Sequence, residues 1–258
     1  MSIRRPLEYS IEKLSDVMKW RDENGTPTLK DMVKIANGPS NAPEATENYQ
    51  HYERCKAVTT ALNNGSLYWH GLTKEGHPIL WIRCNRKPWY PDVDADIKAL
   101  IILADIGISC MPKNITDFVV VSDSTSPPPP IPTFMIELLK VLVKGYPDRL
   151  HLLASAPVSS IIQFVMKLLL PLMPGRLSTK IHLSDVEGIR EKLEELLPNG
   201  KDDIPTFFNG PVNHDEFYPD ESYCSKKGPG VLKFDFYGMI ERLEKARDDF
   251  EAKSASSN

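Results

Sequence analysis

Histidine and cysteine, the residue types that most often bind metals or act as nucleophiles, are scattered along this chain. They are His51, His70, His77, His151, His182 and His214, and Cys55, Cys84, Cys110 and Cys224. The cysteines form no C-x-x-C pair, and no histidine accompanies them at metal-ligand spacing. Residues 214–216 join His, Asp and Glu, but adjacent side chains in a loop point apart. We therefore expect no metal site and reduced cysteines.

Catalytic motifs are also missing from the sequence. It contains no G-x-S-x-G elbow, no G-x-x-x-x-G-K-[ST] loop, no G-x-G-x-x-G turn and no H-E-x-x-H helix. His151 and His182 fall in apolar runs typical of strands, so we interpret them as core or pocket residues. We predict a protein that is not an enzyme and needs no cofactor.

The overall charge restricts the class of partner. The 258 residues carry a formal net charge of −4, whereas phosphate backbones and acidic bilayers are held by clustered Lys and Arg. We expect no nucleic-acid partner and only local, transient membrane contact. The first residues lead into Pro6 and Glu8 with no apolar run, unlike a secretory signal, so we expect a cytoplasmic protein.

One segment is strongly apolar, the stretch between Pro157 and Pro171. As a helix its 13 residues rise roughly 20 Å, short of the roughly 30 Å hydrocarbon core of a bilayer, so it does not span a membrane. Ser160, Gln163 and Lys167 form one narrow polar stripe. The apolar side carries Val158, Ile161, Ile162, Val165, Leu168, Leu169 and Leu172. This pattern is typical both of a buried core helix and of a helix that lines a lipid pocket or touches a bilayer.

The surrounding pattern predicts the elements that would hold this segment. Helices are expected from Ser10, from Thr28 to Gly38, and over residues 43–63. Apolar runs at 79–84, 118–121, 150–154 and 180–183 favour strands, with helices at 96–108 and 131–144 between them. Ser184 and Glu187 form a capping box for another helix, and an amphipathic helix at 236–251 packs on the body or on a partner.

Strands separated by single helices imply an α/β fold, with a mostly parallel sheet flanked by helices. We divide the chain into an N-terminal helical region (1–66), a central domain (67–212), and a polar connector followed by a C-terminal amphipathic helix (213–258).

Ordered motifs in the central domain resemble a known family. The chain carries GYPDRL at 145–150, ASAP at 154–157, LPL at 170–172 and TKI at 179–181. These are similar to the Y-P-E-R-L, N-A-P, K-P-F-L and K-I series of CRAL-TRIO lipid-binding domains, of the yeast phosphatidylinositol-transfer type. The KEGHP turn at 74–78 is similar to the family's D-x-x-G-R-P turn, with His77 where Arg is usual.

The resemblance implies a lipid pocket floored by the sheet, including Phe118 and Val120, and closed by a mobile gate helix between Pro157 and Pro171. It implies a carrier that holds one lipid and moves or presents it between membranes. Asp148 and Lys180 stand where the family binds an inositol phosphate, although an ordinary ion pair would also explain them. Residues 118–120 offer no side-chain hydroxyl, which argues against phosphatidylcholine.

The resemblance also leaves a second class open, a regulatory module that binds a protein partner or a membrane. The candidate partner surfaces are the C-terminal helix and the proline run Pro127, Pro128, Pro129 and Pro130. That run is typical of a stiff polyproline II segment, which either docks a proline-recognition domain or serves as a rigid connector.

Overall fold

The computed structural model describes residues 7–24, 47–127, 132–160, 163–164, 175–218 and 235–256. The helix expected from Thr28 to Gly38 lies outside these residues, as do Pro128, Pro129 and Pro130.

A five-stranded sheet in the order β1-β2-β3-β4-β5 forms the centre of the molecule. Its strands are β1 Leu67–Leu72, β2 Pro78–Arg83, β3 Phe118–Asp123, β4 Leu150–Ala156 and β5 Ile181–Leu183. β1 pairs antiparallel with β2, and the other pairs are parallel. The central strand β3 is buried along its whole length, which explains its run of branched valines. The predicted α/β fold with a mostly parallel sheet is confirmed.

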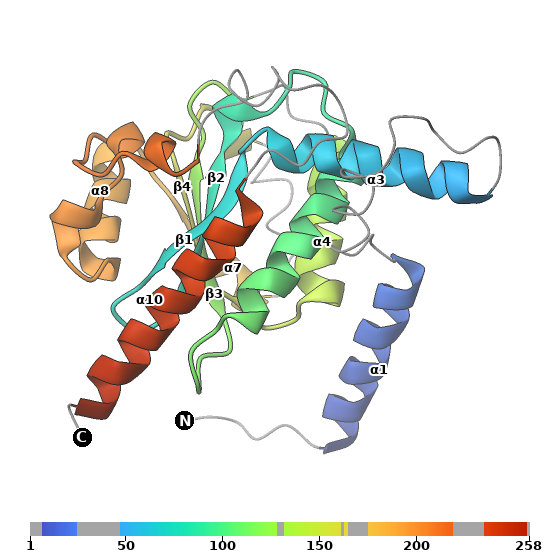
Figure 1. Cartoon of the computed structure of the whole chain (residues 1–258), viewed down its shortest axis with the longest axis horizontal. Helices are drawn as coiled ribbons and strands as arrows, with labels where there is room; N and C mark the ends of the chain where they lie inside the picture. The colour runs from blue at the N-terminus through green and yellow to red at the C-terminus, as the bar shows by residue number, and fades with distance from the viewer. Residues whose placement is uncertain are drawn as a thin grey trace.

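Helices cover the sheet and extend from it (Figure 1). They are α1 Leu7–Glu23, α3 Glu47–Asn63, α4 Val93–Ser109, α5 Pro132–Lys140 with its π-helical continuation η2 Val141–Gly145, α7 Gly175–Ser178, α8 Val186–Leu196 and α10 Phe236–Ser256, with short 3-10 turns η1 Cys84–Arg86, η4 Gly200–Asp203, η5 Thr206–Phe208 and η6 His214–Glu216. The residue that caps α8 is Asp185, whose carboxylate accepts from the Gly188 amide. The predicted Ser184 cap was one residue early.

The sheet has two differently covered faces, which lie towards α4 and α8 in Figure 1. On the α4 face, the Trp69 indole donates to the Leu103 carbonyl at 2.7 Å, and a side chain at Gly107 would collide with the Trp69 ring. On the α8 face, Trp81 packs edge-on against Phe207. Successive side chains of a strand point to opposite faces of the sheet, so the residues of β2 and β3 belong alternately to the α4 face and to the α8 face.

The C-terminal helix α10 packs along β1. Met239 and Leu243 are fully buried, and the Trp69 amide contacts the Met239 sulfur at 3.3 Å. The apolar side of this helix therefore covers the body of its own chain, one of the two arrangements that its pattern allows. The helix continues to Ser256, beyond the end predicted at residue 251.

Candidate functional site

The beginning of the predicted gate lies where β4 ends, after the cis Ala156–Pro157 peptide bond. The Val158 amide donates to the Ser184 carbonyl beyond β5, at 3.1 Å. A helical turn starts at Ser160, and the Gln163 amide donates to the Ser159 carbonyl at 2.9 Å. The next side chain, Phe164, is 62% exposed. The other predicted gate residues, Ile161, Ile162, Val165, Leu168, Leu169 and Leu172, lie outside the described part of the chain.

The predicted pocket floor corresponds to the α4 face of β3, β4 and β5. Register places Val120 beside Leu153, and Leu153 beside Ile181. Val120 is buried, whereas Leu153, Ile181 and Leu183 are only half-buried. Phe118 lies at the start of β3, where its ring packs edge-on against Trp69 at 5.5 Å. The part of this face with apolar surface to offer a ligand is therefore on β4 and β5.

Three buried serines gather at the carboxyl ends of β3 and β4. The Ser124 hydroxyl is 2.8 Å from that of Ser155 and 3.3 Å from that of Ser122. The Cys84 sulfur lies 3.6 Å from the Ser122 hydroxyl, and burial raises the pKa of this thiol. The prediction considered side-chain hydroxyls only at residues 118–120 and missed this cluster. The sequence pattern that could have indicated it is the change from an apolar run to serine at the end of each strand.

Asp148 and Lys180, the predicted head-group residues, both lie at the amino end of β4. Asp148 is exposed in the turn two residues before the strand, with a left-handed backbone (φ 61°). The Lys180 ammonium donates to the Leu150 carbonyl. The sheet thus brings the two residues to one edge, opposite to the edge where the gate begins.

A buried charge network lies at the carboxyl ends of β2 and β3. The Arg83 guanidinium donates to Asp123 at 3.1 Å and to Asp215 at 3.2 Å. Arg86 also pairs with Asp215, and it donates to the Tyr218 carbonyl at 2.7 Å. The network ties residues 213–218, expected in a polar connector, to the sheet.

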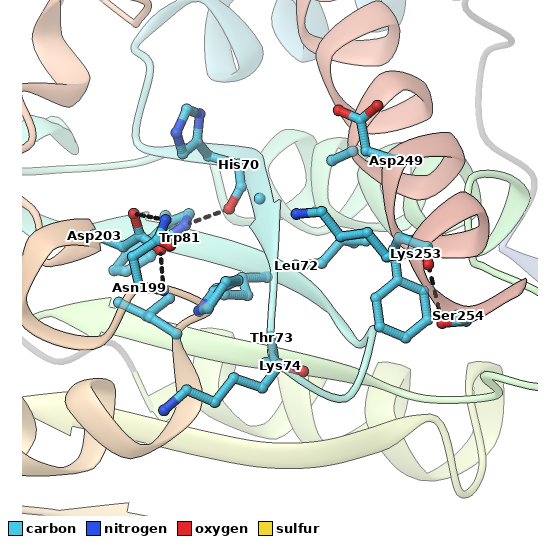
Figure 2. Close-up of a pocket in the computed structure, with 16 residues that line it drawn as sticks. His70, Leu72, Thr73, Lys74, Trp81, Asn199, Asp203, Asp249, Lys253 and Ser254 are labelled. Atoms are coloured by element: carbon cyan, nitrogen blue, oxygen red, sulfur yellow. Dashed lines mark hydrogen bonds between the residues drawn. The ribbon is translucent and has the colours of Figure 1, made fainter. Parts of the chain in front are cut away.

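A groove of about 660 Å³ lies beside β1, on the α8 face (Figure 2). Its apolar surface comes from Leu72, Ile79, Trp81 and Phe250. Charged residues of η4 and of α10 also line the groove, among them Asp203, Asp249 and Lys253. Ile79 and Trp81 point away from the α4 face, so this groove is distinct from the predicted lipid pocket.

Two histidines beside the groove are held neutral by burial. Burial and Arg242 lower the pKa of His70 to about 4. Burial, with His70 and the buried arginines, lowers the pKa of His214 to about 2. The His214 Nδ1 lies 3.1 Å from the Tyr68 hydroxyl, and the ring packs 4.4 Å from that of His70. His70 and His214 are far apart in the sequence. They meet because residues 213–218 fold back on the sheet.

These lowered pKa values predict acid sensitivity. The unfolded chain binds a proton at each histidine near pH 6.5, whereas the folded chain does so only near pH 4 or below. Stability should therefore fall as pH drops below 6.5, by about 2 kcal/mol per histidine at pH 5. Urea unfolding at pH 7.5 and pH 5 measures this loss. The loss of stability between pH 7.5 and pH 5 should be about 2 kcal/mol smaller in His70→Gln than in the parent. An equal loss in that variant would contradict the role given to His70.

Comparison with known proteins identifies the class. The model of the CRAL/TRIO domain matches residues 62–210, more than half of the chain. The chain therefore belongs to the CRAL/TRIO family of lipid-binding proteins, and the resemblance in its motifs is confirmed.

A solved structure titled "Crystal structure of Sfh5" is similar in fold, with a TM-score of 0.51 and 14% identity, covering 86% of this chain and 78% of that one. No curated protein sequence matches the chain. Among the described residues, no helix is both long enough and apolar enough to cross a membrane. Cys55, Cys84 and Cys110 carry free thiols.

Proposed function

We propose that this protein binds one hydrophobic lipid on the α4 face of β4 and β5 and carries or presents it between membranes, without catalysis. The half-buried surface of Leu153, Ile181 and Leu183 is the observation on which the proposal rests. Fully buried strands of a parallel sheet are usually covered on both faces, so aliphatic side chains left partly open can receive an acyl chain.

The position of the gate segment supports the same function. Its described start, at Val158, is at the carboxyl edge of the sheet, and α7, which follows it, precedes β5 at the amino edge. We infer that the segment joining these two points closes over a ligand on this face of the sheet. Each methylene that leaves water contributes about 0.8 kcal/mol, so one acyl chain supplies enough free energy to extract a lipid from a bilayer.

Native mass spectrometry of the purified protein tests the proposal directly. We expect a one-to-one complex with a lipid that organic extraction releases and identifies. Incubation of the extracted protein with vesicles of mixed phospholipids should restore the complex. A protein that neither co-purifies with lipid nor takes it up from vesicles would refute the carrier function.

A phosphoinositide is the candidate ligand class, through Lys180 and Asp148. We expect Lys180→Ala to weaken binding of phosphatidylinositol about tenfold, the loss of one charge-assisted hydrogen bond, and to leave binding of a neutral diacylglycerol unchanged. Lys144→Ala, an exposed lysine on η2, is the matched control. Competition binding with fluorescent lipids measures both. Equal losses for the two lipids would mean that Lys180 only supports the β4 backbone.

The membrane face should include the loop between η1 and α4. Trp89 and Tyr90 are 60% and 85% exposed, and the loop follows the carboxyl end of β2, the edge where the gate begins. Tryptophan and tyrosine favour the bilayer interface. The double variant Trp89→Ser, Tyr90→Ser should bind anionic vesicles about tenfold more weakly in sedimentation. Tyr237→Ser, an exposed aromatic on α10, should bind normally, and the same loss there would contradict the assignment.

A further inference from the structure

Two histidines separated by 74 positions in the sequence stack at the amino edge of the sheet. His77 lies in the β1–β2 turn and His151 is the second residue of β4. Their ring centroids are 3.9 Å apart with an interplanar angle of 25°. His77 is buried and His151 is half-buried, so the pair is reachable from solvent on one side.

Both imidazoles face Asp117 through Nδ1, and the His77 Nδ1 also lies 3.3 Å from the backbone carbonyl of Asp117. Its Oδ1 lies 2.8 Å from the His77 Nδ1, and its Oδ2 lies 3.4 Å from the His151 Nδ1. If each Nδ1–H donates to Asp117, the free lone pair of each ring is on Nε2. Metal-binding histidines are held in this way, with a carboxylate accepting from the nitrogen that does not bind the ion.

A third ligand type stands at the exposed side of the pair. The Glu75 Oε2 lies 3.4 Å from the His77 Nε2. If the His77 proton is on Nδ1, towards Asp117, both of these atoms are acceptors, and a proton or a cation between them would explain their approach. Two ligands on one tetrahedral zinc, with bonds of 2.0–2.2 Å, are also about 3.4 Å apart. One ligand atom from each of Glu75, His77 and His151 lies within 4.8 Å of the others.

We propose that Glu75, His77 and His151 bind a divalent transition metal of the zinc type, with Asp117 as the residue that positions both histidines. Two imidazoles and one carboxylate suit zinc, and the half-exposed location leaves a fourth position for water. Calcium and magnesium prefer oxygen ligands and should not bind here. The ion would join the β1–β2 turn to the amino ends of β3 and β4, away from the edge where the gate begins.

The test is titration of the tag-free full chain with zinc chloride against a chromogenic chelator, after treatment with EDTA. We expect one zinc per chain, a rise in the unfolding temperature of about 3 °C at tenfold excess over the dissociation constant, and no effect of magnesium. Cobalt in place of zinc should give the visible absorption of a tetrahedral site. A chain that takes up less than one zinc, or that shows no such absorption, would overturn the proposal.

Variants locate the site. His151→Gln and Glu75→Gln replace accessible side chains, so they should fold normally and lower zinc affinity about 100-fold and tenfold. His182→Gln, a histidine on β5 outside the cluster, is the matched control and should bind as the parent does. Asp117→Asn should lower affinity between 10-fold and 100-fold while a shifted cobalt spectrum remains. Full affinity in His151→Gln would overturn the assignment.

Discussion

Replacement of Asp123 by Ala is expected to lower the free energy of unfolding by about 3 kcal/mol. Asp123 is 1% exposed, and its carboxylate accepts from the Arg83 guanidinium, which is itself buried. Removal of one partner from a buried pair leaves an uncompensated charge, which costs about 3–5 kcal/mol. We expect a loss at the lower end of this range because Arg83 keeps a second partner. The side chain of Asp215, which is 53% exposed, still contacts Arg83 at 3.2 Å.

The matched control is Asp94→Ala. This exposed carboxylate pairs with Lys98 one helical turn away on α4, a contact worth about 0.5 kcal/mol or less. Urea unfolding of both variants at pH 7.5 separates the buried pair from the surface pair. If Asp123→Ala lost no more stability than Asp94→Ala, the charge network at the carboxyl ends of β2 and β3 would not stabilise the fold.

Regular elements with a strong local pattern were predictable from the sequence. The run Val119, Val120 and Val121 has only strand-forming residues, and it lies in the middle of the sheet. The apolar spacing of residues 96–108 likewise predicts most of α4. Strand β1 was not predicted because its apolar run, residues 67–69, is only three residues long before His70 and Gly71, and the strand depends on pairing with β2 and on packing against α10.

Clusters that the topology assembles were not predictable. His77 and His151 meet because β2, β3 and β4 are neighbours in parallel register, which no spacing in the sequence encodes. His70 and His214 meet because the chain after η5 folds back on β1. Conversely, the ordered motifs at 145–181 identified the family, since their intervals reflect the strand order itself. The division into three domains and the gate assignment stay predictions.

The gate assignment predicts the largest effect on function. The double variant Ile162→Asp, Val165→Asp should abolish lipid transfer between donor and acceptor vesicles, because each carboxylate placed against an acyl chain or bilayer costs about 2.5–3.5 kcal/mol. Urea unfolding should show little change in stability if these side chains face a ligand or a membrane rather than a packed core.

Gln163→Asp supplies the matched control for this variant. It adds a carboxylate to the same segment on the polar stripe, where the Gln163 side chain is exposed, so transfer should stay close to that of the parent. Fluorescence dequenching of a labelled lipid measures the transfer rate of each variant. A folded double variant that still transfers at the parental rate would refute the gate assignment. Equal losses in both variants would show that charge in the segment matters, regardless of its face.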